Sequence, residues 1–376
     1  MTRSVTYLNG LIFDGHALLR DHALGFENGT LAYMGPEDEA PASDQIIDLA
    51  GDILCPGFVD LQVNGGGGIL FNDDPSVHTL SQMASAHRGL GVTAFLPTLI
   101  TDTVDKSQAA IAAVEDAMRA GVPGIVGLHL EGPHLSIPRK GAHDPALIRP
   151  MEPADLETLL QAAGSLPFLK VTIAPENTTE GQVAALTEAG VLVSLGHSDA
   201  DYDTCRRYIA AGARCVTHLF NAMSQLGNRE PGLVGAALAS GDTSAGLIAD
   251  TVHVHPETIR AAWTAKRGPG RIFLVSDAMA VAGSDATEFH LGGRLIKRKD
   301  GVLTLADGTL AGADLDLLTA MRVMVEEVGV ELLEALQACT AVPAGLIGHD
   351  YRFARNCDLV RISPDLTRLV AAEIKV

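Results

Sequence analysis

Polar side chains recur where the apolar runs of this sequence end. These chain positions carry amide, hydroxyl, imidazole or carboxylate groups: Gln62, Asn64, Thr98, Glu131, Glu176, His197, His218, Asp250, His253 and Asp277. Carboxylates and imidazoles bind divalent cations and transfer protons in enzymes. A single histidine at a strand end is more often structural, but core filling does not explain so many titratable or amide groups in equivalent places. The pattern predicts an active site built from residues far apart in the sequence.

Eight apolar, strand-like runs position these groups. The runs cover residues 58–63, 92–98, 124–131, 169–176, 191–197, 215–220, 245–250 and 271–277. Helical candidates lie between them, at 80–90, 104–120, 154–163 and 180–189. Such alternation is typical of βαβ units with a parallel sheet. Eight strands predict a closed (β/α)8 barrel of the TIM type, whose active sites form at the carboxyl ends of the strands. Counting alone leaves an open doubly wound sheet as the alternative.

The two ends of the chain differ from its middle. Residues 5–8, 10–13 and 29–33 are short β-type runs separated by turn pairs such as Asn9-Gly10 and Asn28-Gly29. The tail, at 357–363 and 369–374, has the same character. We therefore expect one small antiparallel β domain formed from residues 1–53 and 346–376, with the barrel spanning 54–345.

Composition excludes several classes of protein. Apolar residues make up 47% of the 376 residues and charged residues 19%, which does not fit a disordered chain. A net charge of −19 argues against a nucleic-acid or anionic-membrane partner but allows a small anionic substrate bound by a few local cations. The five cysteines (Cys55, Cys205, Cys215, Cys339 and Cys357) form no C-x-x-C motif. With no apolar run of signal-peptide or membrane-span length, they predict reduced thiols in a cytoplasmic protein.

Six segments in order along the chain carry a resemblance to a known family. They are Pro56-Gly-Phe-Val-Asp-Leu-Gln-Val-Asn-Gly, His129-Leu-Glu-Gly-Pro-His-Leu, Gly196-His-Ser, Thr217-His-Leu-Phe-Asn-Ala-Met, Arg229-Glu-Pro-Gly and Val275-Ser-Asp-Ala. Together they resemble the N-acetylglucosamine-6-phosphate deacetylases of the amidohydrolase superfamily, from about residue 50 to residue 345. The flanking β segments resemble that family's split small domain, a β-sandwich.

The resemblance implies a divalent metal held by Glu131, His197 and His218. One carboxylate and two neutral imidazoles with open positions also form the ligand set of a catalytic site for Zn²⁺, our first expectation, or for Fe²⁺. Many superfamily members carry His-x-His at the end of the first strand to hold a second metal. Here the positions read Gln62-Val-Asn64, and amides are poor ligands for a transition metal. We expect one ion per chain, and for the two amides either a role in the site or hydrogen bonds to neighbouring loops.

The same resemblance assigns the remaining roles. Asp277 is expected to accept a proton from water and donate it to the departing amine, and His143 to polarise the acetyl carbonyl. The expected substrate-binding residues are Ala142, His143, Asn221, Ala222, Arg229, His253, Leu310, Ala311 and Gly312. Because Gly-x-x-x-x-Gly-Lys-Ser/Thr is absent, glycines 65–68 are interpreted as a loop passing close beneath the substrate rather than as a nucleotide site. A homodimer is expected, in which the partner chain contributes to the phosphate pocket.

Other interpretations share most of these features. An N-acetylgalactosamine 6-phosphate substrate needs the same chemistry and differs at one hydroxyl epimer. Dihydroorotase-like and hydantoinase-like enzymes usually bridge two metals with a carboxylated lysine, whereas this chain offers Glu131. A barrel that kept its fold as a binding or scaffold protein is disfavoured, because Glu131, His197, His218 and Asp277 are all present. The expected partners are therefore an amino-sugar phosphate and a second copy of the chain.

Overall fold

An eight-stranded parallel sheet forms the centre of the molecule. The computed structural model describes residues 4–350, 353 and 359–372. In sheet order the central strands are β8 (Phe58–Val63), β11 (Val92–Ile100), β12 (Leu128–Glu131), β13 (Leu169–Ile173), β14 (Leu192–Leu195), β15 (Cys215–Val216), β16 (Ser244–Leu247) and β17 (Ile272–Leu274). The eight strands and their order were predicted, but several are shorter than expected, and residues 124–127 precede β12 instead of belonging to it.

The sheet closes into a barrel between its first and last strands. Beyond β17, the amide of Asp277 donates to the carbonyl of Gln62 at 3.1 Å, and the amide of Asn64 donates to the carbonyl of Ala278 at 2.8 Å. Val63 and Ala278 form a parallel bridge there. These bonds confirm the closed barrel and remove the doubly wound alternative.

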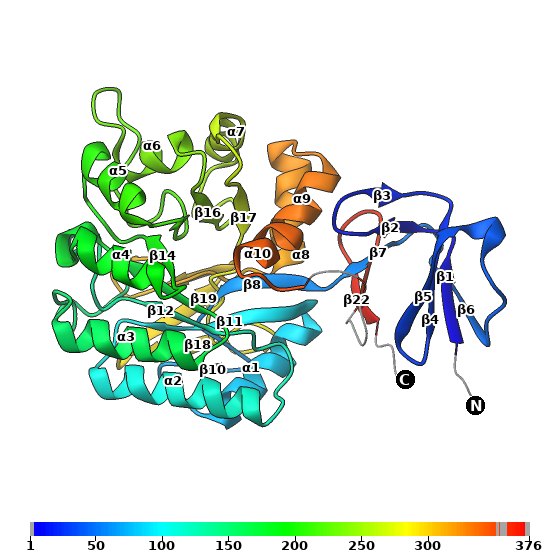
Figure 1. Cartoon of the computed structure of the whole chain (residues 1–376), viewed down its shortest axis with the longest axis horizontal. Coiled ribbons are helices and arrows are strands. Elements are labelled where there is room, and N and C mark those ends of the chain that lie inside the picture. The colour runs from blue at the N-terminus through cyan, green and yellow to red at the C-terminus, as the bar shows by residue number, and fades with distance from the viewer. Residues whose placement is uncertain (1–3, 351–352, 354–358, 373–376) are drawn as a thin grey trace.

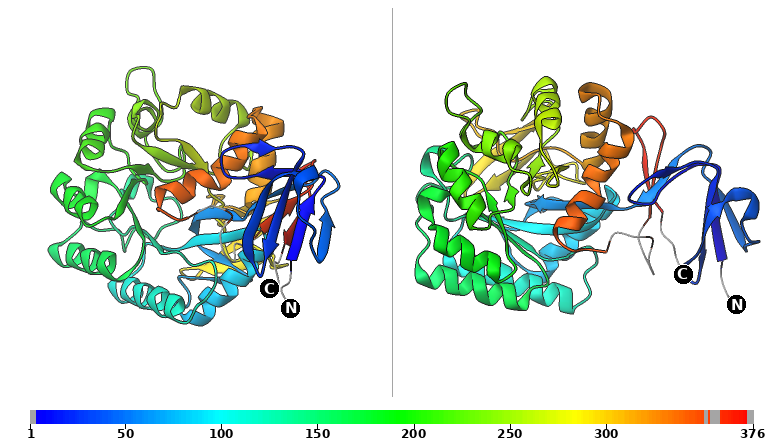
Figure 2. Two further views of the ribbon diagram at one scale, coloured as in Figure 1. Left: turned by 45° about the vertical axis from the view of Figure 1, so that its right-hand side comes forward. Right: turned by 45° about the horizontal axis from the view of Figure 1, so that its top comes forward.

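Helices surround the barrel (Figure 2). They are α1 (Val77–Gly89), α2 (Val104–Arg119), α3 (Pro153–Ser165), α4 (Glu180–Glu188), α5 (Tyr202–Ala211), α6 (Gly232–Ala239), α7 (Pro256–Ala265), α8 (Leu317–Val323), α9 (Leu332–Cys339) and α10 (Ala341–Leu346). Their sequences explain their bounds. In α2, for example, Thr103 caps the amino end by accepting from the amide of Lys106, while Ala110, Ala113, Val114 and Ala117 form the buried stripe.

A three-stranded antiparallel sheet lies between β17 and α8. Its strands are β18 (Glu288–Leu291), β19 (Arg294–Lys299) and β20 (Val302–Thr304). Phe289, Leu291 and Ile296 pack in one cluster with Ile100 and Met279, which lie at the carboxyl end of the barrel strands. A short hairpin of β9 (Gly65–Gly66) and β10 (Ile69–Leu70) packs nearby. The sequence analysis did not predict this sheet, although β18 alternates exposed and buried residues, because its strands are short and its inner face rests on the barrel loops.

The two chain ends meet away from the barrel. The strands β5 (Thr30–Pro36), β4 (His22–Glu27), β1 (Ser4–Leu8) and β6 (Gln45–Asp48) form one sheet. The strands β22 (Leu369–Ala372), β21 (Leu359–Ile362), β7 (Ile53–Pro56), β2 (Leu11–Phe13) and β3 (Leu18–Leu19) form another. Figure 1 shows the blue amino-terminal strands beside the red carboxyl-terminal ones.

These two sheets share a core that includes Tyr7, Phe26, Leu54 and Leu359. The expectation of a purely antiparallel unit was wrong, because β1 pairs with β6 and β2 pairs with β7 in parallel. We propose that residues 1–53 and 346–376 form one β-sandwich domain, with β7 continuing its sheet to Pro56. Cys357, from the predicted tail, lies outside the described residues, and none of the described helices has the length and apolar character needed to cross a membrane.

Candidate active site

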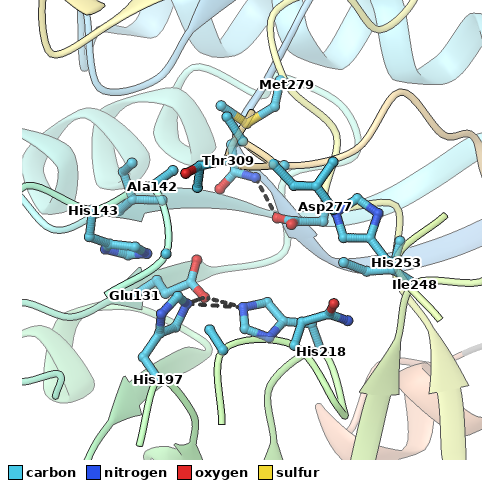
Figure 3. A pocket seen from close by; sticks show the side chains of 18 of the residues that line it. Glu131, Ala142, His143, His197, His218, Ile248, His253, Asp277, Met279 and Thr309 are labelled. Atoms are coloured by element: carbon cyan, nitrogen blue, oxygen red, sulfur yellow. Dashed lines mark hydrogen bonds and ion pairs between the residues drawn. The ribbon is translucent and has the colours of Figure 1, made fainter. Parts of the chain in front are cut away.

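A cavity of about 360 Å³ opens at the carboxyl end of the barrel strands. It has the size of a small-molecule site. Four residues expected to carry out the chemistry, Glu131, His197, His218 and Asp277, line it, together with His143 (Figure 3). They come from the ends of four strands and one loop, and each is at most 8% exposed. The prediction that separate strand ends meet at one site is thus realised in the fold.

Glu131, His197 and His218 converge on a single point. The Oε1 atom of Glu131 lies 3.3 Å from Nε2 of His197 and 3.1 Å from Nε2 of His218, and the two Nε2 atoms are 3.1 Å apart. In a tetrahedral zinc site with bonds of about 2.0–2.1 Å, neighbouring ligand atoms are about 3.3 Å apart. The three atoms therefore fit three corners of such a tetrahedron, and the set could hold one divalent ion.

The electrostatics of this triad favour positive charge. Burial alone would raise the pKa of Glu131, but the hydrogen bonds from His197 and His218 outweigh it and hold the pKa well below its usual range. Burial would lower the pKa of His218, yet the hydrogen bond to Glu131 prevails and raises it. The Nδ1 atom of His197 lies 2.8 Å from the carbonyl of Arg139. With its proton on Nδ1, a neutral His197 ring offers the lone pair of Nε2 to an ion in place of the hydrogen bond to Glu131.

A second possible set of metal ligands overlaps the first and includes His143. Ligand atoms of Glu131, His143 and His197 lie within 4.8 Å of one another, a looser arrangement than the triad above. The amide of Thr101 donates to Nδ1 of His143 at 3.3 Å, and the hydroxyl of Thr101 is 2.8 Å from the same atom. Burial lowers the pKa of His143 to about 3, so its ring is neutral. With Nδ1 accepting, Nε2 carries the proton, which suits a hydrogen-bond donor better than a metal ligand.

Asp277 faces the triad across the cavity (Figure 3). Its side chain accepts hydrogen bonds from Asn64 and Gln62, at 2.7 and 3.2 Å. Burial, followed by the negative charge of Glu131, raises the pKa of Asp277. A carboxyl group with a raised pKa beside a cation site is suited to accept a proton and to release it again.

The backbone turns sharply at the same residues. His197, His218 and Asp277 follow β14, β15 and β17 and have positive φ angles of 48°, 28° and 48°. Such conformations are uncommon for residues with a Cβ atom and cost about 1–3 kcal/mol each. The sharp turns occur where the strands end, so these three side chains do not follow the alternation of the strands.

A hydrogen-bonded column of side chains fills the barrel beneath the site. His129 is fully buried, with Nδ1 3.1 Å from the hydroxyl of Thr98 and Nε2 2.7 Å from that of Thr172. Thr172 contacts Thr217, and Thr217 contacts Ser194, both at 2.7 Å. Because each polar atom of this column has a partner, the column supports the strand ends rigidly. The sequence analysis did not single out His129, although it lies two residues before Glu131 on the same face of β12.

Most of the expected substrate-binding residues line the cavity. They are Ala142, His143, Asn221, Ala222, His253, Leu310, Ala311 and Gly312. The Nδ1 atom of His253 is 2.6 Å from Asp250, which leaves Nε2 for the cavity. Arg229 does not line the cavity and lies exposed in the loop between β15 and α6.

Glu176 and glycines 65–68 do not line the cavity. Glu176 accepts from the hydroxyl of Ser198 and the amide of Asp199, so it orders the loop after β14 and does not line the cavity. The amides of Gly65, Gly67 and Gly68 donate to carbonyls within residues 278–282. Among residues 64–68 Asn64 alone lines the cavity, and a path of the glycines beneath the substrate stays a prediction.

Several lining residues were missed by the sequence analysis. The apolar ones come from different elements: Ile100 ends β11, Ile248 follows β16, Met279 follows the barrel closure and Leu291 ends β18. A single apolar residue in the sequence does not indicate whether it lines a cavity or packs in the core. Gly141 could have been found, since it directly precedes Ala142 and His143, which the sequence analysis expected to bind substrate.

Comparisons with known proteins agree with this geometry. The model of the amidohydrolase family matches residues 53–352. The N-acetylgalactosamine-6-phosphate deacetylase of Shewanella sp. (strain ANA-3) is 46% identical over 299 residues, covering 80% of this chain and 75% of that protein.

Solved structures are also similar over nearly the whole chain. The N-acetylglucosamine-6-phosphate deacetylase from Pasteurella multocida has a TM-score of 0.91 and 34% identity, covering 98% of both chains. A mutant of the enzyme from Mycobacterium smegmatis, in complex with N-acetyl-D-glucosamine-6-phosphate, has a TM-score of 0.89 and 32% identity, covering 99% of this chain and 98% of that one. The family match includes every strand of the barrel and each residue of the triad, and this chain belongs to the amidohydrolase family.

Proposed function

We propose that this protein hydrolyses the acetamide of N-acetyl-D-glucosamine 6-phosphate to glucosamine 6-phosphate and acetate, a step of amino-sugar catabolism. The observation that carries the proposal is the cavity in which a buried carboxylate–imidazole triad faces a second buried carboxylate, Asp277. The deacetylases from Pasteurella multocida and Mycobacterium smegmatis support the choice of substrate.

N-acetylgalactosamine 6-phosphate is the second candidate substrate. The relative from Shewanella, at 46% identity, favours it. The two sugars differ only in the configuration of one hydroxyl group, so the same residues would carry out the chemistry on either.

In the proposed mechanism, Glu131, His197 and His218 would hold one divalent ion, Zn²⁺ or Fe²⁺. When bound, such an ion polarises a carbonyl and makes a water molecule more acidic. Asp277 accepts the proton of the attacking water and passes it to the amine nitrogen as the C–N bond breaks. His143, held at Nδ1 by Thr101, donates from Nε2 to the acetyl oxygen and stabilises the negative charge that develops there.

The phosphate needs a cation that the cavity does not supply freely. Of the described arginines, Arg139 alone lines the cavity, and its side chain is paired with Asp199 at 2.7 Å. Arg229 is exposed and projects from a loop at the same end of the barrel. Ile137, Leu226 and Val252, which are 53%, 57% and 45% exposed, lie on loops of that end too. Exposed apolar groups of this kind suit a subunit interface.

We infer that two chains form a homodimer in which Arg229 of each completes the other's phosphate site. A cytoplasmic location fits the reduced state of Cys55, Cys205, Cys215 and Cys339, all of them buried free thiols.

The first prediction concerns the substrate. Acetate release is to be measured on the 6-phosphates of N-acetylglucosamine and N-acetylgalactosamine and on both unphosphorylated sugars. We expect a high kcat/KM for N-acetylglucosamine 6-phosphate and at least a tenfold lower value for its unphosphorylated parent, since one lost charged contact corresponds to about tenfold or more. A preference for the galactosamine derivative would select the second candidate, and no acetate from any of the four would refute the proposal.

The second prediction concerns the metal. Purified protein should contain about one tightly bound divalent ion per chain, measured by elemental analysis. His197→Ala and His218→Ala should both lose it, because each removes one of three protein ligands. His78→Ala changes an exposed histidine on α1 and should retain the ion. A second ion of equal occupancy in the wild type would contradict the one-ion site.

The third prediction separates the proton carrier from the ligands. Asp277→Asn keeps the shape of the side chain but cannot accept the proton. It should retain the metal and bind substrate, yet lose kcat by at least about a thousandfold, because one group that serves both proton transfers should contribute near the upper end of the range for general acid–base groups. If the variant kept a tenth of wild-type kcat, another group would have to be the base. If it lost the metal, Asp277 would be a ligand.

The fourth prediction concerns Arg229. Arg229→Ala should raise KM for the 6-phosphate about ten- to a hundredfold with little change in kcat, because the phosphate is remote from the scissile amide. Arg267→Ala changes an exposed arginine near the amino end of β17 and serves as the matched control.

Mixing chains tests whether Arg229 acts on the partner's site. An Asp277→Asn chain and an Arg229→Ala chain, unfolded and refolded together, form hybrid dimers with one complete site. Such dimers should recover the wild-type KM in a fraction of sites. No recovery would place Arg229 in its own chain's site or outside both sites.

A further inference from the structure

Two buried amides lie between the carboxylates of the site. Gln62 is in β8 and Asn64 follows it, and they are 0% and 3% exposed. The Nε2 atom of Gln62 donates to both oxygens of Glu131 at 3.3 Å and to Oδ1 of Asp277 at 3.2 Å. The Nδ2 atom of Asn64 donates to the same Oδ1 at 2.7 Å. One short stretch of β8 therefore contacts a residue of the triad and the proposed proton carrier.

Chemistry fixes the orientation of these amides. An ionised carboxylate only accepts hydrogen bonds, so the NH₂ group of each amide must face Asp277 and Glu131. The other atom, Oε1 of Gln62 and Oδ1 of Asn64, is buried and receives no hydrogen bond from the described residues. The bonds to the carboxylates are therefore the polar contacts that these two side chains make in the described part of the chain.

The hydrogen bonds that the Asp277 side chain accepts from the described residues all go to one of its two carboxylate oxygens. Both amides donate to Oδ1, whereas no described residue donates to Oδ2. The main chain of Asp277 is held as well, because its amide donates to the carbonyl of Gln62 and its carbonyl accepts from Ala313 at 3.0 Å. With Oδ1 and the backbone fixed, the carboxylate has one oxygen, Oδ2, whose lone pairs remain for a proton.

Gln62 also separates two like charges. The carboxylates of Glu131 and Asp277 both accept from its single NH₂ group, and without a positive group between them they repel each other. An amide NH₂ offers partial positive charge there without binding a transition metal. An acidic side chain at the same position would instead add a third carboxylate, a set of oxygens able to bind a second divalent ion.

We propose that Gln62 and Asn64 are positioning residues that hold Asp277 by Oδ1, so that Oδ2 moves the proton, and that the Gln62 amide takes the place of a second cation between Glu131 and Asp277. The first part rests on the proposed function, since it concerns the proton carrier of that reaction. The second part concerns only the number of ions that the site accepts.

The first experiment measures kinetics and metal content together. Gln62→Met keeps the length of the side chain, and Asn64→Leu keeps its branching, but neither can donate. Both variants should retain one ion per chain and a KM within about threefold of wild type while losing kcat about ten- to a hundredfold, as misplaced catalytic groups do. Gln182→Met removes an amide of the same type from the amino-terminal cap of α4, where it bonds Met151 and Thr179, and should leave kcat unchanged.

A double-mutant cycle separates positioning from a merely structural role. In the Asp277→Asn background the carboxylate to be positioned is already gone, so adding Gln62→Met should lower the residual kcat by less than about twofold. An effect of the same size in both backgrounds would mean that Gln62 does not act through Asp277. Wild-type kcat in Gln62→Met, with Asp277→Asn inactive, would overturn the positioning role and leave the proposed function intact.

The second experiment does not depend on activity. Gln62→Glu replaces the donor by a carboxylate of the same shape, and its ion content in excess Zn²⁺ should rise from about one to about two per chain. Wild type and Gln62→Met, treated identically and then freed of loosely bound metal, should stay at one. A content of one in Gln62→Glu, in a variant whose circular dichroism matches wild type, would overturn the second part. If the wild type released no acetate from any sugar phosphate, the proposed function would fail while this measurement still decided the role of Gln62.

Discussion

The hydrogen bonds between the segments Gln62–Asn64 and Asp277–Ala278 join the first and last strands of the barrel, and the site depends on them. They bring together residues more than 200 positions apart, and they fix the backbone of Asp277 within reach of the Gln62 side chain. The bonds that close the barrel therefore also position Asp277 in the site. A change that loosened the closure would displace Asp277 relative to Glu131 even if every side chain of the site were intact.

Much of this arrangement could be predicted from the sequence, because the buried strands and the amphipathic helices of a barrel have different patterns of apolar residues. Apolar runs marked all eight strands, and the capped, amphipathic stretch of α2 marked a helix almost to the residue. Since parallel strands end at one rim, Glu131, His197, His218 and Asp277 could be placed together before their distances were known.

Other features have no local signature in the sequence. The left-handed backbone at His197, His218 and Asp277 is stabilised by surrounding contacts, and nothing in the residue types announces it. The sheet β18–β20 packs its inner face on loops of the barrel, so its pattern depends on tertiary neighbours. The position of Arg229 could not be predicted either, because a motif can mark an arginine as important without fixing which cavity it faces. The hydrogen bonds from the amides of Gly65, Gly67 and Gly68 to the 278–282 segment likewise had no signature in the sequence.

The sheet β18–β20 contributes to the cavity wall without belonging to the barrel. It is paired within itself and inserted after the last barrel strand, yet Leu291 forms part of the cavity wall and Arg294 donates to the carbonyl of Ala142, next to His143. Changes within residues 288–304 would therefore reshape part of the cavity wall without replacing any residue of the triad or of the barrel closure. Substitutions in this sheet can therefore alter substrate selectivity without changing the residues that would hold the metal.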